Sequence, residues 1–216
     1  MSKYVMSDIH GCYDKFLAML KKINFSEKDE LYILGDIFDR ERQPLEILEY
    51  IRSHENITLI KGNHEKMFED FMETNDNTLW FYNGGNTTYE QLKLKDLDYI
   101  KNVYEYIVNL PLMVVLKEEK LLLVHAGVYY PEEDVDLETF TNFQEEDICL
   151  WDRSNVGKNK KYKDFKVVCG HTPVQTINGG NRIIRTDVAI YVDCGAVFKG
   201  GKLACLRIDD MEEFYV

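Results

Sequence analysis

Residues 31–40 read LYILGDIFDR: four apolar residues, a glycine, and then two aspartates and an arginine. A short apolar run that ends at a glycine indicates a buried strand followed by a turn. Gly35 permits an unusual backbone conformation, or a close approach of the chain, just before the carboxylate of Asp36. The stretch therefore places ionisable side chains at the end of a core strand, a layout typical of an active site built at strand ends.

The same layout recurs along the chain, because four more polar motifs each contain a histidine and most of them follow an apolar, strand-like run. The motifs are Asp8-Ile9-His10, Gly62-Asn63-His64-Glu65, His125-Ala126-Gly127 and Gly170-His171-Thr172-Pro173. Together they offer imidazoles, carboxylates and one amide, but no thiol. That mixture suits Mn, Fe or Zn and does not suit a structural thiolate zinc site.

The aspartates of Asp8-Ile9-His10 and of residues 35–40 each have a functional and a purely structural interpretation. Asp8 and His10 are two residues apart in extended chain, so both can face one ion; alone, the pair is more often a turn cap beside an incidental histidine. A carboxylate such as Asp36 can bridge two cations. Asp39 can orient an imidazole, and the planar fork of Arg40 matches two phosphate oxygens. The alternative is a surface turn with clustered charges.

The remaining motifs carry the amide and three histidines. The side-chain oxygen of Asn63 is a neutral metal ligand, and His64 beside it is placed to donate a proton. The alternative is that Asn63 caps the helix that follows. His125 and His171 each end an apolar strand. One such histidine is unremarkable, but two of them together with the other motifs are hard to explain as separate accidents.

Length and composition fit one globular domain spanning residues 1–216. The net charge of −12 argues against a nucleic-acid partner, because phosphate backbones need a basic surface. We find no run long enough for a membrane span and no signal peptide. The five cysteines are odd in number and irregularly spaced, so we expect reduced thiols and a cytoplasmic protein.

Strand-like runs alternate with helical periodicity in the first half, which predicts βαβ units and a largely parallel sheet. Residues 75–110 are helical and aromatic in pattern, and we interpret them as a helical insert beside the site. Residues 112–116 and 121–124 read as a hairpin, residues 131–163 as helical or irregular, and the last third as strand-rich. We therefore expect an α/β (α+β) fold in which two sheets pack as a sandwich with helices outside.

Taken in order, the five motifs resemble those of the calcineurin-like metallophosphoesterases. The resemblance is closest to the bacterial and phage branch of the phosphoprotein phosphatase family, which includes lambda-type protein phosphatase and the diadenosine tetraphosphate hydrolases. It spans nearly the whole chain, and the runs 80–88 and 192–203 share it. It implies a four-layer β-sandwich of two mixed sheets flanked by helices, with a dinuclear metal site at one edge.

The resemblance also implies roles for individual residues. His64 is implied as the general acid with Asp39 as its partner, while Arg40 and Arg153 are implied as phosphate clamps. Two divalent ions, with Mn expected before Fe or Zn, are implied to activate a bridging hydroxide that attacks phosphorus directly. The implied metal ligands are Asp8, His10, Asp36, Asn63, His125 and His171.

The substrate stays open at this stage. A phosphomonoesterase acting as a serine/threonine or dual-specificity protein phosphatase is the first hypothesis, and a dinucleotide polyphosphate hydrolase is the second. A metal-binding interaction module without catalysis is the third. Family members carry Gly where this chain has Glu41, which could pair with Arg40 or narrow the substrate entrance. The aromatic residues 80–89 could line a substrate pocket or form an ordinary aromatic cluster.

Overall fold

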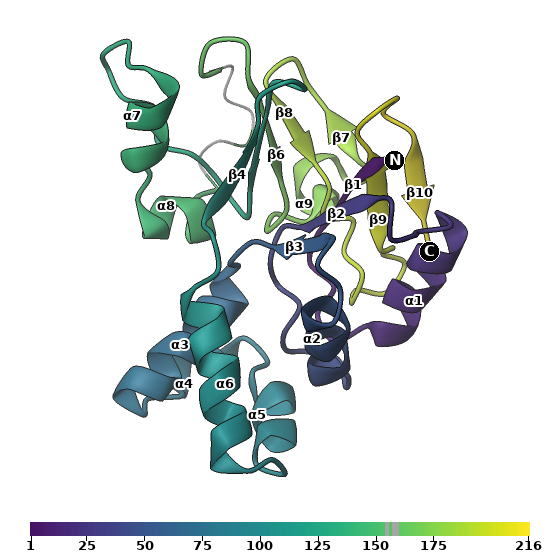
Figure 1. Ribbon diagram of the computed structural model, residues 1–216, viewed down its shortest axis with the longest axis vertical. Helices are drawn as coiled ribbons and strands as arrows, with labels where there is room; N and C mark the ends of the chain where they lie inside the picture. Colours follow the sequence, from purple (N-terminus) through teal and green to yellow (C-terminus); the bar gives the residue numbers. More distant parts are fainter. Residues whose placement is uncertain (154–155, 157–159) are drawn as a thin grey trace.

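The computed structural model describes residues 1–153, 156 and 160–216, and it contains two five-stranded sheets flanked by helices (Figure 1). The strand orders are β10-β9-β1-β2-β3 and β4-β5-β6-β8-β7. Each sheet contains both parallel and antiparallel pairs. The predicted class, a sandwich of two mixed sheets with flanking helices, is confirmed.

The first sheet is built from βαβ units, as the alternating pattern predicted. Its parallel core is β1 (Lys3–Met6), β2 (Glu30–Ile33) and β3 (Ile57–Leu59), and α1 (Tyr13–Lys22) and α2 (Pro44–Arg52) make the crossovers. Two antiparallel strands from the C-terminal end, β9 (Ala204–Arg207) and β10 (Glu213–Tyr215), complete it beside β1. Strand β10 was not predicted.

The second sheet begins with the predicted hairpin of β4 (Met113–Leu116) and β5 (Leu121–Val124). Strand β5 continues in parallel with β6 (Lys166–Cys169) and β8 (Ala189–Tyr191), and β7 (Ile184–Arg185) closes the far edge. All four residues of β5 are buried. A strand buried on both faces explains why its sequence reads as an unbroken apolar run.

Side-chain alternation on β1 shows how the layers meet. Tyr4 and Met6 face a core shared with α1, α2 and α3, whereas Val5 faces a second core shared with the other sheet. Successive residues of a strand point to opposite faces, so the first sheet is covered by helices on one side and by the second sheet on the other.

Four helices gather at one end of the molecule (Figure 1). They are α3 (Asn63–Thr74), α4 (Thr78–Tyr82), α5 (Asn86–Leu92) and α6 (Leu97–Val108). Helices α7 (Leu137–Asn142) and α8 (Glu146–Trp151) precede β6, and α9 (Val174–Asn178) follows it. Within the described ranges, no helix has the length and apolar content that a membrane crossing requires.

Candidate metal centre

The polar motifs meet because the strands that precede them are parallel. Asp8 follows β1, Asp36 follows β2 and Asn63 follows β3 in one sheet, while His125 and His171 follow β5 and β6 in the other. Parallel strands bring their carboxyl ends to the same edge. All five side chains are buried there, none more than 7% exposed.

The turns that carry these residues adopt an uncommon backbone conformation. Eleven described non-glycine residues have positive φ, and six of them are predicted site residues. They are Asp8, His10, Asp36, Asp39, Arg40 and His171, with φ between 47° and 71°. Such conformations are rare for residues with a side chain and concentrate at functional sites, where surrounding structure enforces them.

Two glycines let the end of β2 touch the start of α3. Gly35 has a φ of 82°, and a Cβ added to it would lie 2.5 Å from the Cα of Gly62. The close approach anticipated for Gly35 is therefore real. It allows the amide of His64 to donate to Asp36 Oδ1 at 3.0 Å, which fixes the carboxylate.

Glu65, which the sequence analysis did not assign, locks the same junction. Its buried carboxylate accepts hydrogen bonds from the amides of Asp36, Ile37 and Gly62 at 2.8–2.9 Å and from Phe38 at 3.3 Å. Gly62 is the N-cap of α3. The capping therefore comes from Gly62 and Glu65, so the side chain of Asn63 is free to face the site.

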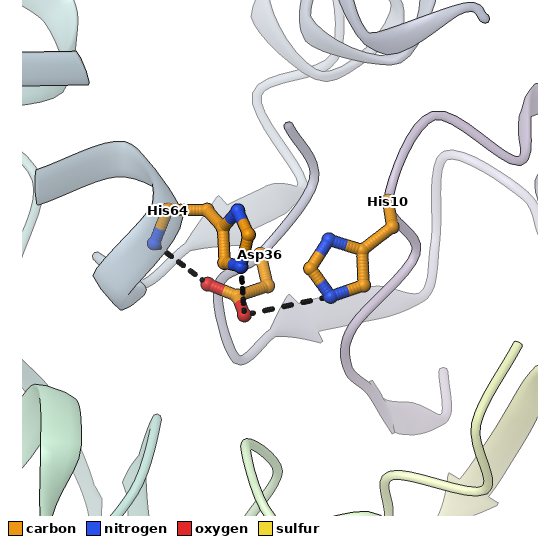
Figure 2. Close-up of side chains that lie close together, drawn as sticks. All are labelled: His10, Asp36 and His64. Carbon is orange, nitrogen blue, oxygen red and sulfur yellow. Dashed lines mark hydrogen bonds and ion pairs between the residues drawn. The ribbon is translucent and has the colours of Figure 1, made fainter. Parts of the chain in front are cut away.

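The first group of candidate ligands surrounds one oxygen of Asp36 (Figure 2). His10 places Nε2 3.6 Å from Asp36 Oδ2, and its Nδ1 donates to the carbonyl of Phe38 at 2.8 Å. The Nε2 atom of neutral His10 therefore carries a free lone pair. Burial, together with His64 and Arg40, lowers the pKa of His10 well below its usual value, which favours the neutral, ligating form. His64 Nε2 lies 3.9 Å from the same oxygen.

The second group, Asp36, His125 and His171, surrounds the other oxygen. His125 Nδ1 donates to the carbonyl of Leu34 at 2.6 Å, so its Nε2 is left with a lone pair. That Nε2 lies 3.5 Å from Asp36 Oδ1 and 3.1 Å from His171 Nδ1. Burial, His125 and a nearby arginine lower the pKa of His171 to about 2, so this ring is neutral.

Asn63 completes the second group through its side-chain oxygen. Asn63 Oδ1 lies 2.8 Å from His125 Nε2 and 3.0 Å from His171 Nδ1. His171 Nε2 accepts from Arg153, so the neutral His171 ring carries its proton at Nδ1, between Asn63 Oδ1 and His125 Nε2. A divalent ion bound here would take the place of that proton, and this donor set fits N and O ligation.

Asp8 sits at the edge of this cluster. Its Oδ2 accepts from the amide of His171 at 3.0 Å and from the hydroxyl of Ser7. It belongs to neither group of three, but it lines the same cavity as Asp36 and Asn63. Burial, Asp8 and Glu65 raise the pKa of Asp36 well above its usual value. The centre thus concentrates negative charge that a metal ion would neutralise.

His64 and Asp39 form a hydrogen-bonded pair beside the candidate metal ligands. His64 Nδ1 donates to Asp39 Oδ2 at 2.6 Å, and its Nε2 lies 3.1 Å from a guanidinium nitrogen of Arg40. Arg40 can only donate, so Nε2 of His64 acts as the acceptor. Burial raises the pKa of Asp39 to about 7, against hydrogen bonds from Thr88 and Trp80. The ring is held in one orientation with Nε2 toward the metal cluster.

A cavity of about 520 Å³ opens over the cluster. Arg40 and Arg153 both line it, and Arg153 Nε donates to His171 Nε2 at 3.2 Å. Trp151 and Phe198 supply aromatic walls, and the Arg40 guanidinium lies 5.9 Å from the Phe198 ring centre. The structure therefore brings both predicted clamp arginines to the space above the candidate ligands.

Asp193 also lines this cavity and was missed by the sequence analysis. It is 4% exposed and follows β8, the strand beside β6. Burial and the neighbouring Asp8 raise its pKa well above the usual range. The signal was available, since the apolar run 189–192 ends at this aspartate as the other strands end at theirs.

The structure bears on two questions left open by the sequence: the place of the aromatic segment and the role of Glu41. Trp80 is 1% exposed and packs with Phe68 and Phe71, so its ring does not face substrate. Of the following turn, Asn83 reaches the cavity. Glu41 is exposed and lines a neighbouring cavity of about 590 Å³, and no ion pair with Arg40 occurs in the described structure.

Comparisons with known proteins agree with this geometry. The sequence matches the family model of the calcineurin-like phosphoesterases over residues 1–198. It is 31% identical to serine/threonine-protein phosphatase 2 of Salmonella typhimurium, over 71% of this chain and 68% of that protein. It is also 31% identical to the symmetrical bis(5'-nucleosyl)-tetraphosphatase of Wigglesworthia glossinidia brevipalpis, over 76% of this chain and 56% of that enzyme.

The chain thus spans little more than half the length of that second relative. Among solved structures, a metallophosphoesterase from Sphaerobacter thermophilus superposes with a TM-score of 0.61. The superposition covers all of this chain and 86% of the other at 16% identity. Similarity at that level of identity demonstrates the shared fold.

Proposed function

The chain belongs to the calcineurin-like phosphoesterase family, and we propose that it is a metal-dependent protein phosphatase acting on phosphoserine and phosphothreonine. The observation that carries the proposal is the buried cluster of Asn63 Oδ1, His125 Nε2 and His171 Nδ1, which lie within 3.1 Å of one another beside the carboxylate of Asp36. A donor set of this kind suits a divalent cation, and the arginine-lined cavity above it suits a phosphate.

We propose two divalent ions per chain, Mn²⁺ in the first instance, with Asp36 shared between them. The other proposed ligands are Asp8, His10, Asn63, His125 and His171. When bound, such ions lower the pKa of water and neutralise charge on phosphoryl oxygens. The five cysteines are unpaired, four of them buried, which supports our proposal of a cytoplasmic protein made of one domain.

The proposed work of the side chains follows from their placement. Arg40 and Arg153 bind the phosphate oxygens on which charge builds during the transfer. His64 protonates the oxygen that leaves, and Asp39 keeps the His64 ring in the tautomer and orientation required. Because Nδ1 is bound to Asp39, the proton delivered to the leaving oxygen would have to be taken up first at Nε2, which accepts from Arg40 in the structure.

A dinucleotide tetraphosphatase is the second candidate, because one of the relatives carries that name. The expected adenine-stacking surface was the aromatic insert, and Trp80 of that insert is buried, so we place this candidate second. A metal-binding module without catalysis is disfavoured by the complete set of proposed ligands, acid and arginines.

The test is a comparison of kcat/KM for a phosphoserine peptide and for diadenosine tetraphosphate, each with Mn²⁺ and with a chelator. We expect metal-dependent phosphate release and a clear preference for the peptide. Preference for the dinucleotide would make the second candidate correct. Absence of metal-dependent hydrolysis of either compound would overturn the enzymatic proposal.

A further inference from the structure

The carboxylate of Asp39 is held by two side chains that come from the helices after α3. Trp80 Nε1 donates to Asp39 Oδ2 at 2.8 Å, and Thr88 Oγ1 donates to Asp39 Oδ1 at 2.5 Å. The Thr88 hydroxyl also accepts from the Asp39 amide at 2.9 Å. All three residues are essentially inaccessible to solvent, at 0–1% exposure.

The hydrogen bond to Asp39 requires a tryptophan at position 80, whereas packing alone does not. The Trp80 ring lies 5.2 Å from the ring centre of Phe71 and 5.7 Å from that of Phe68, in an aromatic cluster that a phenylalanine could also join. An indole brings in addition a buried N–H that must find an acceptor. Here that acceptor is the oxygen of Asp39 that also binds His64.

The turn between α4 and α5 is shaped to keep this arrangement. A Cβ added to Gly85 would overlap the Trp80 indole, so only glycine lets α5 pack this closely on the ring. The carbonyl of Gly84 accepts from the Arg40 amide at 3.3 Å. Residues 80–88 therefore bind the backbone and side chain of the Asp39–Arg40 segment from one side.

We propose that Trp80 and Thr88 are positioning residues of the phosphoesterase reaction: they fix Asp39 so that His64 can deliver its proton to the leaving oxygen. The inference rests on the proposed function. The terminal torsion of an aspartate is broad and roughly two-fold, so a carboxylate without these donors can turn away from His64. The helical segment 75–110 then serves the chemistry through Asp39, without contacting the substrate through Trp80.

The experiment compares substrates that differ in their need for an acid. In a phosphoserine peptide the leaving group is the serine oxygen, a poor, alkoxide-type leaving group that needs the proton. In p-nitrophenyl phosphate the leaving group is p-nitrophenolate, which departs readily without a proton. For Trp80→Phe and Thr88→Val we expect kcat on the peptide to fall about 10-fold, the worth of one hydrogen bond to a charged group. On p-nitrophenyl phosphate we expect kcat to fall by less than about 3-fold. We expect KM to change little for both substrates.

Two comparisons separate positioning from a general loss of structure. Thr88→Ser keeps the hydroxyl and should retain near-normal activity on both substrates. Phe71→Leu disturbs the ring that packs on Trp80 but has no described contact with Asp39, so it should lower the midpoint of thermal unfolding, Tm, without changing the ratio of the two activities.

A double-mutant cycle gives the sharpest test. If Trp80 acts through Asp39 and His64, then Trp80→Phe should add almost nothing to His64→Asn on the peptide. Additive losses, or equal losses of the single variants on both substrates, would overturn the inference while leaving a working phosphatase. A wild-type protein that hydrolyses neither compound with Mn²⁺ would instead overturn the proposed function, and this inference with it.

Discussion

Asn63 Oδ1 lies 2.8 Å from His125 Nε2, and His171 Nδ1 lies within 3.1 Å of both atoms. The three residues are 46 to 108 positions apart in the sequence, so a cation bound by all three would tie distant segments of the folded chain together. Metal and fold stability should therefore be linked.

We expect saturating Mn²⁺ to raise Tm. A ligand at 100 times its dissociation constant stabilises the native state by about 2.7 kcal/mol, which in a domain of this size corresponds to roughly 5–10 °C. Calorimetry with Mn²⁺ and with a chelator measures the shift. His125→Ala should lose most of it. His54→Ala is the matched control, because His54 stacks on Tyr50 instead. Equal shifts in both variants would contradict this ligand set.

Asp36→Asn tests whether one carboxylate serves both positions. Asparagine keeps an oxygen that can accept from the His64 amide, so α3 should stay capped and the variant should fold. It cannot supply two negatively charged oxygens, one to each group of ligands. We expect bound metal to drop from two ions per chain to fewer than one, by elemental analysis after dialysis. Asp70→Asn, a change at a half-buried position of α3 that pairs with Lys66, should keep both. Two ions retained in the Asp36 variant would rule out sharing.

His64→Asn should reduce kcat on a phosphoserine peptide by roughly 10²–10⁴-fold, the usual worth of general acid catalysis. The imidazole is held between Asp39 at 2.6 Å and Arg40 at 3.1 Å, so its loss removes the proposed acid from this position. Steady-state kinetics with metal content measured in parallel checks the prediction. Full activity of a metal-loaded variant on this poor leaving group would show that another residue supplies the proton.

The sequence located most of the candidate site because its local signals were strong. Each apolar run that ends at Asp8, Asp36 or His125 gives both the strand and the position of the polar residue at its end. Parallel pairing, which the strand–helix alternation predicts, then places these ends together. The first half of the fold could be anticipated from these two facts alone.

What the sequence did not reveal depends on contacts between distant residues. Trp80 and Asp39 are 41 positions apart, and nothing local distinguishes an indole that binds a carboxylate from one that only fills space. Glu65 looked like an ordinary first-turn glutamate, yet it binds amides of the turn after β2. Strand β10 was not predicted because three half-buried edge residues carry almost no periodic signal.

A further prediction concerns the charged cluster that joins α3 to the end of β3. Lys61 is 4% exposed, and its Nζ lies 2.7 Å from Glu69 Oε2, while Lys66 lies 3.0 Å from the other oxygen of Glu69. Burial opposes ionisation of Glu69, but the hydrogen bonds from the two lysines outweigh it and hold its pKa below the usual value. Glu69 is thus more acidic in the folded chain than in the unfolded one.

A carboxyl with a lowered pKa stabilises the fold above its unfolded pKa, here 4.5, and this stabilisation is lost as pH falls through the folded value. We therefore expect Glu69→Gln to lower the free energy of unfolding at pH 7 by about 2 kcal/mol, since Lys61 is left buried with weaker partners. Below pH 4.5 the difference from wild type should shrink. Urea titrations at pH 7, 5 and 3.5 measure it, and Glu90→Gln, in an exposed pair with Lys93, should change little at any pH. A difference that grows as pH falls would reverse the sign of this argument and show that Glu69 is held protonated.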